Sequence, residues 1–253
     1  MIGGQLSLRR LTPQAGAVLV AAAGAWLLLA SLARGMGAMP GTMGLGIAAF
    51  VGVWTLMMAA MMLPSVAPLA SMYARSFTTA RMRRLCVFAL GYLAVWAVAA
   101  LPAFGAAWLA GQLAGSNRAV ATAMASFVFV ACGLYQLTPF KDRCLARCRS
   151  PLAQLLYYGN YRGATRDLRV GLHHGAYCFG CCWALMGLLI AFGVMNVTAM
   201  VAIAGVVLIE KVWTQGKGFT RFTGVIALAL ALIVIWVPAL APGLHSSPMG
   251  HMS

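Results

Sequence analysis

The sequence predicts an all-α fold, a polytopic bundle of about seven transmembrane helices with its N-terminus inside and its C-terminus outside the membrane. Of the 253 residues, 62% are hydrophobic and only 8% are charged, whereas about a quarter of the residues in a soluble domain are charged. The hydrophobic residues also gather into stretches of about 20, which is the length that crosses a bilayer core. This composition excludes an ordinary soluble enzyme, a disordered protein and a secreted disulfide scaffold.

We expect residues 1–253 to form a single integral membrane domain, and the first span to be retained, because its apolar stretch is longer than that of a signal peptide. Pro64 is expected to kink or end the second span. The fifth and sixth spans meet at Asn196, which predicts a tight turn, with a single bent element as the alternative. Short helices near the membrane surface are expected in an inner loop, 138–175, and a flexible tail in 242–253. The expected spans are 15–33, 43–63, 85–110, 119–137, 176–195, 196–212 and 223–240.

Basic residues set the predicted orientation. Of the 18 lysines and arginines, all except Arg34 and Arg118 fall before the first span or in alternate loops. Cytoplasmic loops collect such residues, so these segments are expected to lie inside. The net charge of +15 then follows from topology, and the lipid bilayer is the expected partner. Nucleic acid is not expected as a partner, because no basic face is available outside the bilayer.

The cysteines gather at the predicted cytoplasmic end, where thiols stay reduced and are better explained as metal ligands than as disulfides. The densest group is Cys178, Cys181 and Cys182, which His173 and His174 precede. Positions 174, 178 and 182 share one helix face, and 181 lies beside 178. One imidazole and three thiols could therefore converge on a metal ion, and His173 is a further candidate ligand. The alternative is that the cysteines only pack as small apolar residues.

Cys144 and Cys148 form a second pair, one helical turn apart in the inner loop. Their basic neighbours, such as Arg143 and Arg147, are expected to favour the thiolate, which is the form that binds metals. Taken alone, this spacing is weak evidence for a site. Beside the first group, the pair becomes a candidate source of ligands.

Methionines supply a second kind of soft ligand. Met57, Met58, Met61 and Met62 form a thioether stripe on the second span, at the same predicted depth as the cysteines. Thiolates and thioethers together suit Cu(I) far better than Mg, Ca or Mn. The alternative is that the stripe only packs in the core.

Glu210 and Lys211 lie at the inner end of the sixth span. Glu210 could orient a ligand or take up protons released on metal binding. The alternative is an interfacial ion pair with Lys211 or with an arginine of the loops. Asp142 and Asp167 are expected to pair with nearby arginines. In the tail, His245, Met249, His251 and Met252 could collect copper weakly or simply be disordered.

Four motifs in combination resemble a bacterial family of predicted metal-binding integral membrane proteins, of which some are named copper chaperones. They are W-x-x-M-M-A-A-M-M-L-P at Trp54 to Pro64, K-D-R-C-x-x-x-C-R-x-P at Lys141 to Pro151, G-C-C-W-x-L-M at Gly180 to Met186, and the pair at 210–211. The resemblance covers about residues 40–220 and does not extend to the tail. It implies metal binding, without a settled activity, at Met57, Met58, Met61, Met62, Cys144, Cys148, Cys181, Cys182 and Glu210.

These patterns favour a bacterial inner-membrane protein that binds a soft metal, Cu(I) before other soft metals, for transfer, transport or delivery. The expected partner is a protein that donates or accepts copper. No enzymatic activity is expected. Because the chain has no P-loop, transport would be passive, ion-coupled or driven by a partner. One alternative is a membrane thiol–disulfide oxidoreductase using Cys178 and Cys181, although these thiols are predicted to face the reducing side. The other is an assembly subunit whose cysteines only pack.

Overall fold

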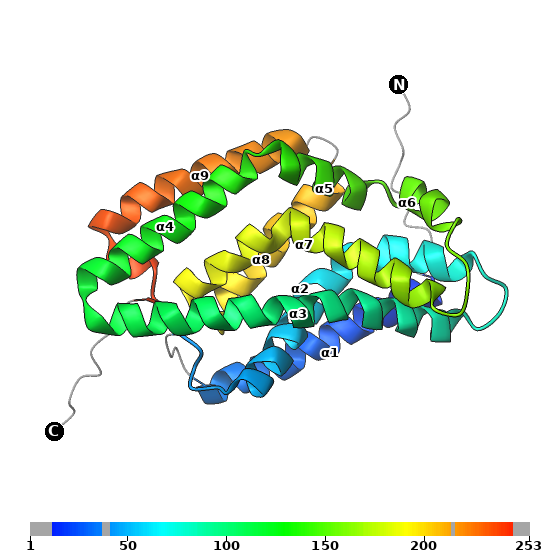
Figure 1. Cartoon of the computed structure of the whole chain (residues 1–253), viewed down its shortest axis with the longest axis horizontal. Helices are drawn as coiled ribbons and strands as arrows, with labels where there is room; N and C mark the ends of the chain where they lie inside the picture. Colours follow the sequence, from blue (N-terminus) through cyan, green and yellow to red (C-terminus); the bar gives the residue numbers. More distant parts are fainter. Residues whose placement is uncertain (1–11, 37–40, 214–215, 245–253) are drawn as a thin grey trace.

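The computed structural model describes residues 12–36, 41–213 and 216–244, and every regular element in these residues is helical (Figure 1). The predicted all-α fold class is therefore confirmed for the described part of the chain. The elements are α1 (Pro13–Met36), α2 (Ile47–Arg75), α3 (Arg81–Ser116), α4 (Arg118–Gln136), α5 (Pro139–Arg149), α6 (Pro151–Tyr158), α7 (Arg166–Phe192), α8 (Val197–Val212), α9 (Gly216–Trp236) and the short 3-10 helix η1 (Pro238–Leu240).

Six of the described helices, α1, α2, α3, α4, α7 and α9, are long and apolar enough to cross a membrane. They correspond to six of the seven expected spans. The remaining one is α8, which has 16 residues and a length of about 24 Å, somewhat less than a bilayer core. The turn before α8 is tight, as predicted, because Gly193 takes a φ of 95° and the Asn196 side chain accepts a hydrogen bond from the Ala199 amide at 3.1 Å. The alternative of a single bent element is wrong.

Two helix boundaries differ from the sequence prediction. Pro64 does not end α2, which continues through Pro68 to Arg75. Each proline removes one backbone donor, and the buried side chains on both sides of Pro64 stabilise the continuous helix. In addition, α7 begins at Arg166 rather than near residue 176, so both histidines before Cys178 are helical.

Glycines allow the helices of the bundle to approach closely. A Cβ atom on Gly171 of α7 would lie 2.2 Å from the carbonyl oxygen of Phe88 in α3, and one on Gly91 of α3 would lie 2.5 Å from the carbonyl oxygen of Leu168. Small residues at such crossings are typical of membrane helices. The helices contact one another in the order α1, α2, α3, α7, α4 and α9, with α4 and α9 at one edge (Figure 1).

α4 and α8 end beside the middle of α7. The hydroxyl of Tyr135, in the last turn of α4, donates to the carbonyl oxygen of Gly180, and Lys211, near the end of α8, contacts Cys178. The short helices α5 and α6 follow α4 and contact α7 and α2, respectively (Figure 1). Two short helices thus form within residues 138–175, where short helices were expected, and α5 brings this segment to the middle of α7.

Candidate metal centre

Three cysteines of α7 form a buried triad of sulfur atoms. The Sγ atoms of Cys178, Cys181 and Cys182 all lie within 4.8 Å of one another, and each residue is at most 1% exposed. Steps of three and four residues place them on one helix face. The thiols of Cys181 and Cys182 donate to the carbonyl oxygen of Cys178 at 3.1 and 2.7 Å. The backbone of α7 therefore helps to fix where these sulfur atoms point.

Two sulfur atoms from other helices join this triad. Sγ of Cys148, on α5, lies 3.8 Å from Sγ of Cys181. Sδ of Met62, on α2, lies 3.9 Å from Sγ of Cys182. We refer to Cys148, Cys178, Cys181, Cys182 and Met62 together as the sulfur cluster. Three helices that are far apart in the sequence thus bring soft ligand atoms to one place.

The spacing within the cluster fits a metal ion. Within the triad, Sγ of Cys182 lies 3.7 Å from that of Cys181 and 3.9 Å from that of Cys178. An ion bonded to several sulfur atoms at about 2.3 Å, the length of a Zn–S bond, holds neighbouring sulfur atoms about 3.8 to 4.0 Å apart. The triad could therefore bind a metal with little movement of its side chains.

Two polar groups contact Cys178, and a third supports one of them. Its Sγ atom lies 3.0 Å from Nζ of Lys211 and 2.9 Å from the hydroxyl of Tyr92, and Nζ of Lys211 also donates to Oγ of Ser65 at 2.9 Å. Lys211 is buried and forms no carboxylate ion pair in the described part of the chain. Its ammonium group is therefore placed to offset negative charge on the sulfur atoms. Sequence reasoning missed Tyr92 and Ser65, although Ser65 directly follows the methionine motif.

The ion-pair partner of Glu210 is Lys141 and not Lys211. Its carboxylate accepts hydrogen bonds from Nζ of Lys141 at 2.8 and 3.0 Å, and both side chains are almost completely buried. Gln136 also bonds to both members of this pair, and the Arg149 guanidinium donates to the carbonyl oxygen of Glu210 at 2.6 Å. A direct Glu210–Lys211 ion pair is wrong, because successive helical residues point about 100° apart. Glu210 instead anchors α5 against α8.

His174 lies near the sulfur cluster but outside the triad of mutually close ligand atoms. It is buried, and its ring stacks on Tyr92 with the centroids 6.2 Å apart. Its Nδ1 atom is buried without a hydrogen-bond partner. An unsatisfied polar atom of this kind needs an explanation, and a neighbouring metal ion could supply one.

His173 points into a different environment. Its ring is surrounded by the rings of Tyr157, Tyr158, Tyr161 and Tyr177, at centroid distances of 4.9 to 6.1 Å. Burial raises the pKa of the Tyr158 hydroxyl, which stays protonated and can donate to Nδ1 of His173 across 3.3 Å. The structure therefore accounts for His173 as part of an aromatic cluster rather than as a neighbour of the triad.

The sequence led us to expect that nearby arginines would favour the thiolate form of Cys144 and Cys148. The structure instead favours their protonated thiols. The pKa of Cys144 is raised, first by burial and then by the neighbouring Cys181 sulfur. The pKa of Cys148 is raised well above its usual value, first by its hydrogen bond to Cys181 and then by burial. The reason is the direction of the side chains, since Arg143 and Arg147 point outward while the thiols point inward. Sγ of Cys144 packs against the backbone of Gly180, where a Cβ atom would lie only 2.9 Å away.

The remaining predicted residues divide into three groups: the methionines of α2, the two aspartates and the tail. Met57, Met58 and Met61 are buried like Met62, but of these four only Met62 has a described contact with a thiol. Asp167 pairs with Arg84 at 3.2 Å and accepts a hydrogen bond from Tyr73, whereas neither ion pair among the described residues involves Asp142. His245, Met249, His251 and Met252 lie outside the described residues.

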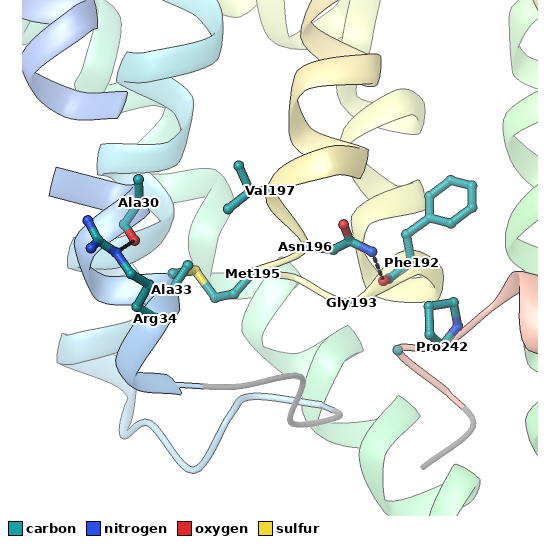
Figure 2. Close-up of a pocket in the computed structure, with 10 residues that line it drawn as sticks. Ala30, Ala33, Arg34, Phe192, Gly193, Met195, Asn196, Val197 and Pro242 are labelled. Carbon is teal, nitrogen blue, oxygen red and sulfur yellow. Dashed lines mark hydrogen bonds between the residues drawn. The ribbon is translucent and has the colours of Figure 1, made fainter. Parts of the chain in front are cut away.

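A cavity of about 400 Å³ opens beside the far end of α7, roughly 22 Å along the helix axis from Cys178. Figure 2 shows Arg34 and Met195 at this cavity, with the Asn196 amide donating to the carbonyl oxygen of Phe192. The lining contains one thioether, from Met195, and no thiol or carboxylate. It therefore lacks the ligand set of the sulfur cluster.

A family model described as PpoB2, copper chaperone, matches residues 51–234. The chain belongs to this family. The match spans α2 to α9 and includes every residue of the sulfur cluster, which confirms the family resemblance seen in the motifs. Membership in the PpoB2 copper chaperone family suggests a role that is not enzymatic and involves copper-handling partners in general. No curated protein and no solved structure matches the chain.

Proposed function

We propose that this protein is an integral membrane copper carrier that holds Cu(I) at the sulfur cluster and transfers it to or from a partner. The observation that carries the proposal is the meeting of Cys148, the α7 triad and Met62 at sulfur–sulfur contacts of 3.7 to 3.9 Å. Membership in the PpoB2 family supports copper as the metal.

The ligand chemistry supports Cu(I) over harder ions. Thiolates and a thioether make a soft set, and no carboxylate belongs to the triad of mutually close ligand atoms. Metal-bound thiols are thiolates, so a loaded cluster carries net negative charge. The Lys211 ammonium, 3.0 Å from Cys178, offsets part of that charge inside the bundle, where an unpaired charge is costly.

Other candidate ligands have supporting roles in this proposal. Met58 lies one turn before Met62 on the same face of α2, and with Met57 and Met61 it would pass the ion through weak thioether bonds. His174 would complete the coordination, because its buried Nδ1 has no other described partner. Cys144, packed beside the cluster, would hold α5 in place rather than bind the metal.

We place the protein in the inner (plasma) membrane of a bacterium, with the cluster towards the cytoplasm. The basis is the distribution of basic residues. All lysines and arginines except Arg34 and Arg118 lie before the first expected span or in every second loop between the expected spans, and cytoplasmic loops collect such residues. Direction of movement is not encoded in the ligands, so both uptake and delivery agree with the site.

Copper stoichiometry tests the proposal directly. The detergent-purified protein is loaded with Cu(I) under anaerobic conditions and its bound copper is measured. We expect a Cys178→Ser/Cys181→Ser/Cys182→Ser variant to lose its bound copper, while Cys86→Ser, which removes an exposed thiol, keeps it. The proposal fails if the triple variant binds as much copper as the wild type.

A thiol–disulfide oxidoreductase is the second candidate. The observation that favours it is the contact between Cys148 and Cys181, 3.8 Å apart on two different helices, because two thiols so placed could exchange a disulfide. Thiol trapping in cells distinguishes the two functions. Reversible oxidation of Cys181 linked to a membrane quinone would favour the oxidoreductase, and a permanently reduced pair would favour the copper carrier.

A further inference from the structure

Access to the sulfur cluster is limited to one thiol. Cys178, Cys181 and Cys182 are buried, with exposures between 0 and 1%. Cys148 is only partly buried as a residue, so of the four it lies nearest to the surface, with its thiol directed towards the triad. A copper ion in the triad is enclosed, and Cys148 is the ligand through which an external molecule has the shortest approach to it.

Cys148 also occupies a fixed position. It lies on α5, which is anchored to α8 by the buried pair of Lys141 and Glu210 and by hydrogen bonds from Arg149 to the carbonyl oxygens of Glu210 and Trp213. These contacts hold Sγ of Cys148 3.8 Å from Sγ of Cys181. One copper ion could bridge this distance while it moves between the two sulfur atoms.

The outer face of α5 is basic. Arg143 and Arg147, which are exposed, lie on the same short helix as Cys148, and Ala146 is exposed between them. Asp142 is the one acidic residue in α5. An approaching ligand with negative charge is therefore favoured at this face.

From these observations we propose that Cys148 is the exchange thiol through which copper enters and leaves the buried triad, and that its donor or acceptor is an anionic thiol-bearing molecule that approaches over Arg143 and Arg147. This inference rests on the proposed function, because it requires copper at the triad.

The transfer is a balanced exchange of ligands. For delivery, the Cys148 thiol gives its proton to the triad sulfur that it displaces from copper, so that one Cu–S bond forms as one breaks. An acceptor thiol then binds copper and gives its proton to the next protein sulfur that leaves, until Cys148 leaves last and takes up a proton. Copper remains Cu(I) throughout, so the exchange needs no oxidant or reductant, as in other thiolate substitutions.

The rate of copper release tests this role. Protein loaded with one equivalent of Cu(I) is mixed with excess bathocuproine disulfonate, an anionic Cu(I) chelator, and the coloured complex is followed in time. We expect Cys148→Ser to release its bound copper, expressed as a fraction of what it holds, at least about tenfold more slowly than the wild type, a rise in barrier of about 1.4 kcal/mol. The Cys86→Ser control should release copper at the wild-type rate.

The outcomes separate this inference from the proposed function. A fractional release rate in Cys148→Ser equal to that of the wild type, or a faster one, overturns the exchange role. Neither result affects the triad, whose own test is the copper content of the triple variant. Alkylation of the loaded wild type gives a readout without mutation: Cys148 should react with iodoacetamide well before the triad, and equal protection of all four thiols contradicts the proposal.

Salt dependence tests the charge of the acceptor. Release to the anionic chelator should slow as ionic strength rises, because salt screens the attraction to Arg143 and Arg147. An Arg143→Gln/Arg147→Gln variant should release copper more slowly at low salt and lose most of this dependence. If the variant and the wild type share one salt profile, an anionic acceptor at this face is ruled out.

Discussion

Lys211 is a buried cation beside the sulfur cluster, in the centre of the molecule. It is a buried cation with a thiol, rather than a carboxylate, at 3.0 Å, and the Ser65 hydroxyl holds its other side at 2.9 Å. The neighbouring residue, Glu210, faces a different direction and neutralises Lys141. Two adjacent residues of α8 thus have separate roles. Lys211 places a positive charge beside the sulfur atoms, and Glu210 anchors α5.

Replacing Lys211 should weaken copper binding without removing it. In Lys211→Met the thiolates of a loaded cluster lose their nearest cation, and we expect the affinity for Cu(I) to fall by about 10- to 100-fold, as when groups that support metal ligands are lost. Competition with a Cu(I) chelator measures the change. Lys217→Met is the matched control, because Lys217 is exposed. Equal affinities of the two variants would remove Lys211 from the site.

At the scale of the helices, the close crossing of α3 and α7 forms one side of the metal site. Gly91 and Gly171 let the two helices approach until a Cβ atom on either would meet a backbone carbonyl of the other at 2.2 to 2.5 Å. This approach brings Tyr92 of α3 within 2.9 Å of Cys178. The packing of two glycines therefore determines one of the polar contacts of the triad.

A substitution at this crossing should separate helix packing from helix propensity. Gly171→Ala gains up to about 1 kcal/mol of helix propensity but overpacks the crossing, so we expect a net loss of roughly 1–3 kcal/mol of stability. Gly187→Ala, in the same helix, has no atom within 4 Å of the new Cβ and should be neutral or stabilising. Thermal unfolding in detergent compares the two. A Gly171→Ala protein as stable as Gly187→Ala would show that α3 and α7 are not in close contact.

The sequence predicted those parts of the site that depend on local spacing. Cys178, Cys181 and Cys182 converge because steps of three and four residues share a helix face in any α-helix. Tyr92 could not be found in this way, because its contact with Cys178 depends on which helices pack together. His173 was misplaced for a related reason. Adjacent histidines point about 100° apart, so only one of them could face the thiols, and the helix phase decided in favour of His174.

At the scale of the whole molecule, polar contacts concentrate where the helices of different length meet. α4 and α8 end beside the middle of α7, and α5 and α6 cover the part of α7 that continues beyond them (Figure 1). The sulfur cluster, the Lys141–Glu210 pair and the tyrosines around His173 all lie in this region. The cavity at the other end is lined mainly by apolar side chains and contains no thiol.

Labelling from outside the cell should locate the cluster relative to the membrane. Asn117, between α3 and α4, and Ala164, between α6 and α7, are both exposed and lie at opposite ends of the bundle. In a Cys86→Ser background we expect a membrane-impermeant maleimide to label Asn117→Cys in intact cells, and Ala164→Cys only after the cells are opened. The reverse pattern would place the sulfur cluster towards the outside and require copper chemistry in an oxidising compartment.

The buried Lys141–Glu210 pair bears on how fast the proposed carrier would work. Neither side chain is more than 2% exposed, and breaking a buried ion pair by separating its partners is strongly unfavourable. Swinging α5 away from the bundle to uncover the triad would therefore be a rare event. The rate of copper transfer should consequently be limited by the encounter of a partner with the rigid face of α5. It should rise with the concentration of the partner and not depend on an opening motion of the carrier.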